Sequence, residues 1–109
     1  MKYVITYCDI DCTCDYVENC ANGGLLSHRI FGSAEEAREE MLRLTKEKVE
    51  VMNNESGCYS KEYGYEYEIF DQMNSGIKEI PDVCVEWYYN GDLVSTTTIQ
   101  VEGVEEWLN

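Results

Sequence analysis

The amino-acid sequence predicts a single α+β domain, residues 1–109, in which an antiparallel β-sheet of about five strands packs on one amphipathic helix. Three observations support this fold class. Segments near both ends of the chain alternate apolar and polar residues, as half-buried strands do. One central segment instead has the apolar spacing of a helix, and turn residues separate the segments. The predicted order of the elements is ββαβββ.

The first two strands are predicted on either side of a cysteine-rich segment. Lys2–Cys8 (KYVITYC) is rich in β-branched and aromatic residues, which favours a strand. Leu25–Phe31 (LLSHRIF) is the predicted second strand, and the turn signal Asn22–Gly24 (NGG) precedes it. If these two strands pair antiparallel, Cys8–Cys20 forms the long loop of a hairpin.

The central helix is predicted to begin after Ser33. This serine is a favoured N-cap residue, and Glu36 stands at the position that completes a capping box. The turn-rich segment Asn53–Gly57 (NNESG) is predicted to end the helix. The apolar residues that define its buried stripe are Ala34, Ala37, Met41 and Leu44.

Three more strands are predicted after the helix. Lys61–Phe70 (KEYGYEYEIF) alternates cleanly, with tyrosine and isoleucine on one face and glutamate on the other. Val83–Tyr89 (VCVEWYY) and Asp92–Val101 (DLVSTTTIQV) are predicted to form a hairpin around Asn90 and Gly91.

The sequence allows two registers of this hairpin. A two-residue turn would pair Trp87 with Val94 and would place the apolar residues of the two strands on opposite faces. A three-residue loop with a bulge at Gly91 pairs Trp87 with Leu93. We predict the bulged register, because it gathers the apolar side chains on one face. These side chains are Val83, Val85, Trp87, Leu93, Ile99 and Val101.

The chain is strongly acidic, and its charge is unevenly distributed. It contains 22 acidic and 8 basic residues, and its formal net charge is −14. Residues 49–109 contain thirteen acids but only Lys61 and Lys78, so most of the excess lies there. Such a charge repels nucleic acid and anionic membranes and attracts basic partners. We therefore expect a basic protein surface as the partner, with no direct nucleic-acid or membrane contact.

The cysteine-rich segment leaves three interpretations open: reduced thiols, a metal site with His28 as a further ligand, or disulfides. Its spacing, C-x3-C-x-C-x5-C, lacks the paired knuckles typical of zinc sites. The N-terminal residues also lack the apolar core of a signal peptide. We therefore expect reduced thiols, no cofactor and a cytoplasmic location. The cysteines concerned are Cys8, Cys12, Cys14 and Cys20.

No motif that announces a catalytic mechanism is present, so we expect a non-enzymatic protein. His28 is the only histidine, and no group that would orient it as a catalytic base can be identified. The sequence also contains no phosphate-binding loop.

The acidic residues of the C-terminal half are the candidate partner-binding residues. Glu66 and Glu68 should point the same way from one strand, about 6.6 Å apart, and Glu86 should lie on the same sheet face. Tyrosines near them would supply contact area. A solubility role is the alternative interpretation of such a surface. The candidates are Glu66, Glu68, Glu86, Asp92, Glu102, Glu105, Glu106, Tyr63, Tyr65, Tyr88 and Tyr89.

In general character the chain resembles the small acidic inhibitor proteins of phages and mobile elements, including anti-CRISPR and antirestriction proteins. The resemblance rests on the acidic-aromatic stretches YGYEYEIFD, PDVCVEWYYNGD and VEGVEEWLN. It implies that the chain acts in the cytosol of a host cell, where it blocks the nucleic-acid-binding site of a CRISPR effector or other nuclease by charge mimicry. It assigns no role to any single residue.

Two other functions are also compatible with the sequence. A small zinc-binding or thiol protein would use the cysteine-rich segment and His28. A module that neutralises a basic cognate protein, as in toxin–antitoxin pairs, would use the acidic surface. The sequence leaves open whether the exposed sheet face or edge forms a homodimer.

Overall fold

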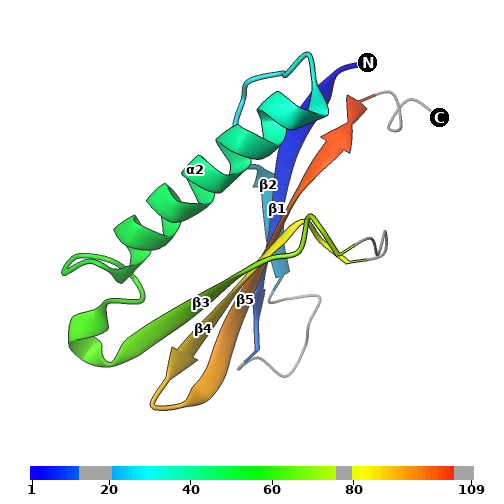
Figure 1. Ribbon diagram of the computed structural model, residues 1–109. Helices are drawn as coiled ribbons and strands as arrows, with labels where there is room; N and C mark the ends of the chain where they lie inside the picture. Colours follow the sequence, from blue (N-terminus) through cyan, green and yellow to red (C-terminus); the bar gives the residue numbers. More distant parts are fainter. Residues whose placement is uncertain (13–20, 76–79, 105–109) are drawn as a thin grey trace.

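The structure, a computed structural model, describes residues 1–12, 21–75 and 80–104 and confirms the predicted fold class (Figure 1). Five antiparallel strands form one sheet, and one long helix packs against it. The order of the strands and the long helix is ββαβββ, as predicted. The elements are β1 (Tyr3–Asp11), β2 (Ala21–Leu25), α2 (Ala34–Asn53), the short 3-10 helix η1 (Lys61–Tyr63), β3 (Tyr65–Asp71), β4 (Val83–Tyr89) and β5 (Asp92–Gly103).

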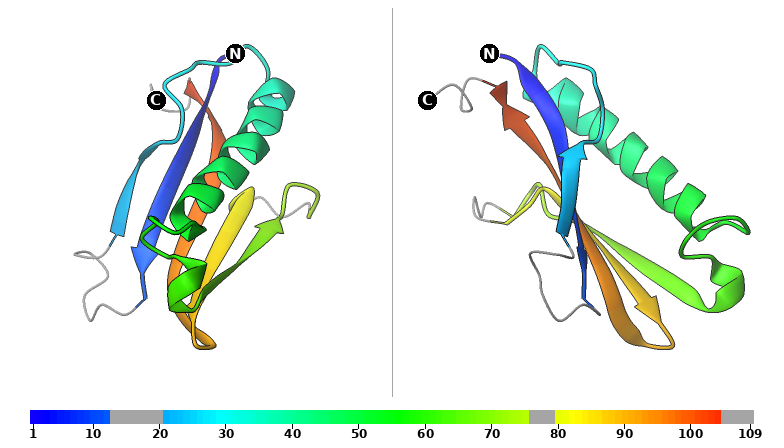
Figure 2. Two further views of the ribbon diagram at one scale, coloured as in Figure 1. Left: turned by 90° about the vertical axis from the view of Figure 1, so that its left-hand side faces the viewer. Right: turned by 180° about the vertical axis from the view of Figure 1, so that it is seen from behind.

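The strand order across the sheet is β2-β1-β5-β4-β3, which places β2 and β3 at the two edges. All four pairings are antiparallel. Helix α2 crosses one face of the sheet and packs mainly on the central strands β5 and β1, as the two views of Figure 2 show. The opposite face has no helix on it within the described part of the chain.

Helix α2 begins where the sequence predicts. The Ser33 side chain accepts a hydrogen bond from the backbone N–H of Glu36 at 3.2 Å, which caps the first turn. Ala37, Met41, Thr45 and Val49 recur every four residues and are buried against the sheet. This four-residue spacing keeps one stripe of the helix on the core.

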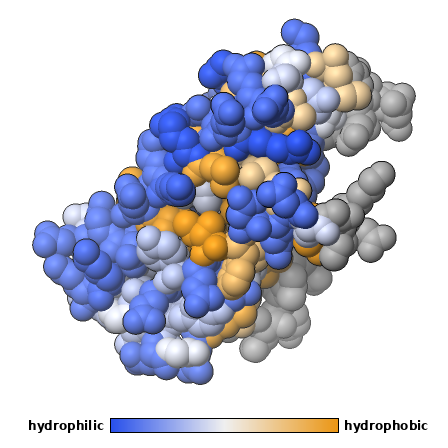
Figure 3. Space-filling view, viewed as in Figure 1, coloured by the Kyte–Doolittle hydropathy of each residue, from blue (hydrophilic) through white to orange (hydrophobic). Residues whose placement is uncertain are grey.

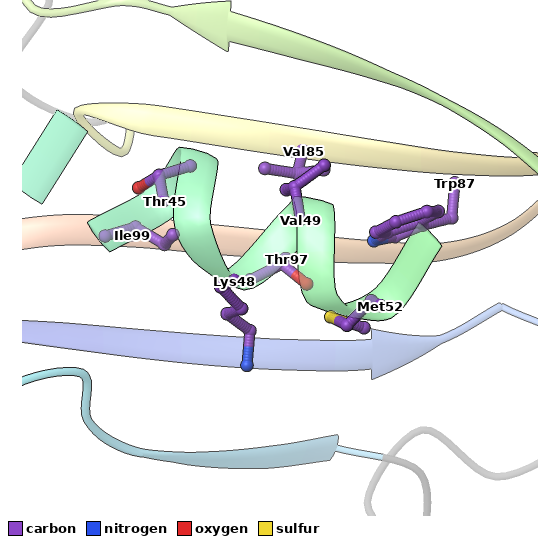
Figure 4. Close-up of a pocket in the computed structure, with 8 residues that line it drawn as sticks. All are labelled: Thr45, Lys48, Val49, Met52, Val85, Trp87, Thr97 and Ile99. Carbon is purple, nitrogen blue, oxygen red and sulfur yellow. The ribbon is translucent and has the colours of Figure 1, made fainter. Parts of the chain in front are cut away.

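The core lies between α2 and the middle of the sheet. Ile5, Phe31, Met41, Val83 and Ile99 belong to one buried cluster. A second cluster joins Val49 of α2 to the β4 residues Val85 and Trp87. Side chains from α2, β4 and β5 converge between these clusters and leave no space for a water molecule (Figure 4). This interior is packed core and offers no ligand site.

The second strand differs from the prediction. Strand β2 is Ala21–Leu25, so the Asn22–Gly24 segment that was expected to be a turn lies inside the strand. Of the predicted strand Leu25–Phe31, Leu25 alone belongs to β2, and Phe31 makes an isolated bridge to Tyr3. The predicted antiparallel hairpin of β1 and β2 is nevertheless present.

The predicted register of the β4–β5 hairpin is wrong. Asn90 and Gly91 have φ angles of 50° and 87°, as a two-residue type I′ turn requires. The register shifts between Tyr88 and Trp87, so that Trp87 pairs with Ser95. A bulge therefore exists, but Val94 is its extra residue, and this side chain packs on the cluster around Trp87.

Candidate functional site

The face of the sheet opposite α2 carries most of the sequence-predicted carboxylates. We call it the open face, because no described element packs on it. Cross-strand neighbours share a face, so the pairing registers determine which residues belong to it. The open face comprises Val4, Thr6, Cys8 and Ile10 of β1; Leu93, Thr96, Thr98, Gln100 and Glu102 of β5; Cys84, Glu86 and Tyr88 of β4; and Glu66, Glu68 and Phe70 of β3.

Three glutamates meet on the β3–β4 half of the open face, and we call them the carboxylate cluster. Glu68 and Glu86 are direct cross-strand partners, and Glu66 lies two residues from Glu68 opposite Tyr88. Like charges directly opposite each other in a sheet are destabilising. The sequence predicted the shared face of these glutamates, and the register confirms it.

Tyr88 lies beside the carboxylate cluster, directly opposite Glu66. Its hydroxyl donates a hydrogen bond to the Glu86 carboxylate. This bond, with desolvation and the negative charge of Glu86, raises the pKa of Tyr88 to about 12. A phenol that stays protonated can keep donating to the carboxylate, so it holds one oxygen of Glu86 in place at neutral pH.

The sheet and the helix differ in their charged residues. None of the five strands contains lysine or arginine. Helix α2, in contrast, mixes both signs, and Arg43 bonds to Glu40 and Glu47 on the helix itself. The acids of the strands are Asp9, Asp11, Glu66, Glu68, Asp71, Glu86, Asp92 and Glu102, and the bases of α2 are Arg38, Arg43, Lys46 and Lys48.

Asp92 and Glu102 lie at opposite ends of β5. Asp92 is exposed beside the hairpin turn, where it pairs with Tyr89. Glu102 is on the open face but about 20 Å along β5 from the row that contains Glu86. Its carboxylate accepts a hydrogen bond from the Gln100 amide at 2.8 Å. Glu105 and Glu106 lie outside the described residues.

The predicted tyrosine anchors do not form one surface with the glutamates. Tyr65 and Tyr89 lie on the helix side of the sheet, where their rings pack with centroids 5.0 Å apart. Tyr63 is 71% exposed in η1, before β3 begins. Of the four predicted tyrosines, only Tyr88 lies on the open face beside the glutamates.

Comparisons with known proteins found no relative. No protein-family model, curated protein or solved structure matches the chain.

Two apolar residues beside the carboxylate cluster were missed from the sequence. Phe70 follows Glu68 on the open face and is 38% exposed. Leu93, opposite Tyr88, is 40% exposed. The alternation of β3 could have found Phe70, since it continues the series of Glu66 and Glu68. Leu93 could not be found, because the predicted register assigned it to the buried face.

The residues that would hold a metal ion under the alternative interpretation are not brought together where the structure describes them. Cys8 and Cys12 are four residues apart along β1 and its end, which is about 13 Å in a strand and too far to share one zinc ion. His28 lies near the opposite end of β1, between Leu26 and Phe31, which bond to the backbone of Ile5 and Tyr3.

The other two cysteines of that alternative interpretation, Cys14 and Cys20, are outside the described residues. Among residues 1–12, 21–75 and 80–104, no three histidine, cysteine, aspartate or glutamate side chains are grouped so that they could hold a metal ion. Burial raises the pKa of the Cys84 thiol, and the negative charge of Glu86 adds to this effect. Cys84 is therefore protonated at neutral pH and is a poor nucleophile.

In the described segments, no helix has both the length and the apolar character required to cross a membrane.

Proposed function

We propose that this chain is a non-enzymatic inhibitor that binds a basic surface of another protein through the open face of its sheet. The observation that carries the proposal is the carboxylate cluster: Glu66, Glu68 and Glu86 share one face on which no described element packs, and no strand contains a basic residue. Carboxylates in this arrangement present negative charge to a partner's lysine and arginine side chains.

The energetic cost of the cluster supports this proposal over a solubility role. Glu68 directly opposite Glu86 costs the free chain about 0.2–1 kcal/mol. A surface that served only solubility would gain as much from interspersed charges of both signs. A basic partner would convert this repulsion into attraction, so the arrangement suits a chain that works when bound.

The partner we propose is a nucleic-acid-binding groove of a nuclease, with a CRISPR effector as the leading candidate. Such grooves are lined with lysine and arginine, because they neutralise phosphates. The chain would occupy the groove and exclude the nucleic acid by charge and steric competition. The general resemblance to acidic phage inhibitors agrees with this partner class.

A competition assay tests the proposal. Fluorescence anisotropy would follow labelled DNA bound to a purified RNA-guided nuclease while the chain is added at 50 mM and 300 mM salt. We expect displacement that weakens steeply with salt. The triple variant Glu66→Gln, Glu68→Gln, Glu86→Gln should displace the DNA about tenfold less well, from about 0.5 kcal/mol per lost ion pair.

A matched control separates the open face from net charge. Glu35, Glu39 and Glu50 are exposed on α2, and the triple variant Glu35→Gln, Glu39→Gln, Glu50→Gln changes the net charge by the same amount. We expect it to displace DNA almost as well as the parent chain. Equal losses in the two variants, or displacement that is indifferent to salt, would contradict a site on the open face.

A further inference from the structure

Strand β3 forms an edge of the sheet that the described residues leave unpaired. It pairs with β4 on one side only, and five of its seven residues are exposed. Edge strands are normally protected by charged side chains, especially lysine, by proline or by a bulge, because their free backbone groups can pair with another strand. Tyr65–Asp71 contains no proline, lysine or bulge, and its charged residues are all acidic, so they would repel an acidic strand but attract a basic one.

The hydrogen-bonding phase of β3 identifies which backbone groups face outward. Just beyond the strand, the Gln72 N–H donates to the Asp82 carbonyl at 2.8 Å, across the continued β3–β4 register. Residues of an antiparallel strand alternate between bonding to the partner strand and pointing away from it. The N–H and C=O groups of Tyr67, Ile69 and Asp71 therefore point away from β4.

Contacts at the start of β3 agree with this phase. Outward-pointing groups of Tyr65 are already bonded: its N–H donates to the Ser60 carbonyl at 3.4 Å, and its carbonyl accepts from the Asn53 amide at 3.4 Å. No described residue bonds to the outward groups of Tyr67 or Ile69. These two residues offer two donors and two acceptors in the spacing that an added strand requires.

We propose that the β3 edge binds an extended segment of the basic partner, which adds to the sheet as a sixth strand. This proposal rests on the proposed function and specifies how the partner is held. Main-chain bonds to Tyr67 and Ile69 would provide affinity, as in other cases of strand addition. On the open face, alternate lysine or arginine residues of the segment would lie beside Glu66 and Glu68.

The other face of the added strand would meet an apolar surface. Tyr67 and Ile69 lie on the helix side of β3, where Tyr67 packs on Trp87 at 5.4 Å between ring centroids. Helix α2 packs on β5 and β1, so this side of β3 is incompletely covered. Figure 3 shows hydrophobic side chains at the surface between α2 and β3. The segment that fits therefore alternates basic and apolar residues.

A second copy of the chain fits this edge poorly. Antiparallel pairing of two β3 strands would place Glu66 and Glu68 beside the same residues of the partner copy on one face. The two chains would also bring together net charges of −14 each. Charge complementarity thus favours a basic segment over self-association.

Synthetic peptides test the inference directly. The probe is a capped seven-residue peptide of alternating lysine and valine, titrated by isothermal calorimetry at low salt. Two control peptides have the same sequence and charge but carry N-methyl groups on the backbone. One is methylated on the lysine nitrogens and the other on the valine nitrogens. In an added strand only one of these two sets of N–H groups faces β3, so we expect one control to bind at least tenfold more weakly than the other.

Amide hydrogen exchange supplies the second measurement. In the free chain, the Tyr67 and Ile69 amides should exchange fast, while the Glu68 and Phe70 amides are protected by β4. Peptide binding should slow exchange at Tyr67 and Ile69 at least tenfold. The double variant Glu66→Lys, Glu68→Lys should lose the lysine–valine peptide and instead bind a glutamate–valine peptide.

Each outcome separates this inference from the proposed function. Equal binding of both N-methylated peptides without new protection at Tyr67 and Ile69 would overturn strand addition and leave charge-based binding intact. Failure of every peptide, while the chain still displaces DNA from the nuclease, would also overturn it. If the same amides become protected when the chain alone is concentrated, the β3 edge binds a second copy of the chain and the inference is overturned. Failure of both assays would remove the proposed function itself.

Discussion

Reversing the charge of Glu68 should stabilise the free protein while it weakens partner binding. Cross-strand partners have Cβ atoms about 5 Å apart, which allows the Glu68 and Glu86 carboxylates to approach each other to about 6 Å. Two like charges at that distance in water repel by about 0.7 kcal/mol. Glu68→Lys replaces this repulsion with attraction, and we expect a gain of about 1 kcal/mol in the free energy of unfolding after side-chain ordering.

Urea denaturation at 20 mM and 1 M salt measures this gain. The Debye length falls to about 3 Å at 1 M, so we expect less than half of the gain there. Because any such change also relieves the overall negative charge, Glu39→Lys on the exposed surface of α2 is the matched control. If Glu68→Lys raises the free energy of unfolding no more than Glu39→Lys does, or if the increase persists in 1 M salt, the inferred repulsion between Glu68 and Glu86 is refuted.

Three further predictions concern the helix cap, Tyr88 and the thiols. Ser33→Ala removes the side-chain acceptor for the first turn of α2 and should cost about 1 kcal/mol in urea denaturation, with the fold retained by circular dichroism. The pKa of Tyr88 rises from 10.0 to about 12 on folding, so its contribution to stability is complete below pH 10 and is lost as the pH rises toward 12. Stability measured across that interval should fall less in Tyr88→Phe than in the parent chain. Iodoacetamide followed by mass spectrometry should modify exposed Cys58 before Cys84, whose pKa burial raises, and equal rates in the folded chain would contradict this.

The sequence predicted those elements whose apolar periodicity is intrinsic to the segment. Ser33 as N-cap, the helical spacing that includes Ala37 and Met41, and the alternation of β3 and β4 all depend on local patterns. The predicted position of the second strand is wrong, because the position of β2 depends on its pairing with β1 and not on a pattern within its own sequence. A Cβ atom at Gly23 would lie 2.8 Å from the Tyr7 carbonyl, so only glycine fits at that point of the sheet. A glycine pair read in isolation indicates a turn, and only the pairing with β1 shows why it lies in a strand.

The candidate site shows the same limit. The shared face of Glu66 and Glu68 follows from a period of two residues within one strand. The direct opposition of Glu68 and Glu86 depends on the β3–β4 register, which no local pattern specifies. The tyrosines were grouped with the glutamates by composition, whereas Tyr65 obeys the alternation and turns to the helix side.

The unequal charge of the two layers gives the described part of the molecule an electric dipole moment. The strands carry eight acids and no bases, whereas α2 carries six acids and four bases, so the negative pole of these elements lies on the sheet side. In the field of a cationic groove, a torque would act on the molecule over about a Debye length before any atoms touch. The protein would thus approach a basic partner with the sheet facing it, and a larger fraction of encounters would lead to binding.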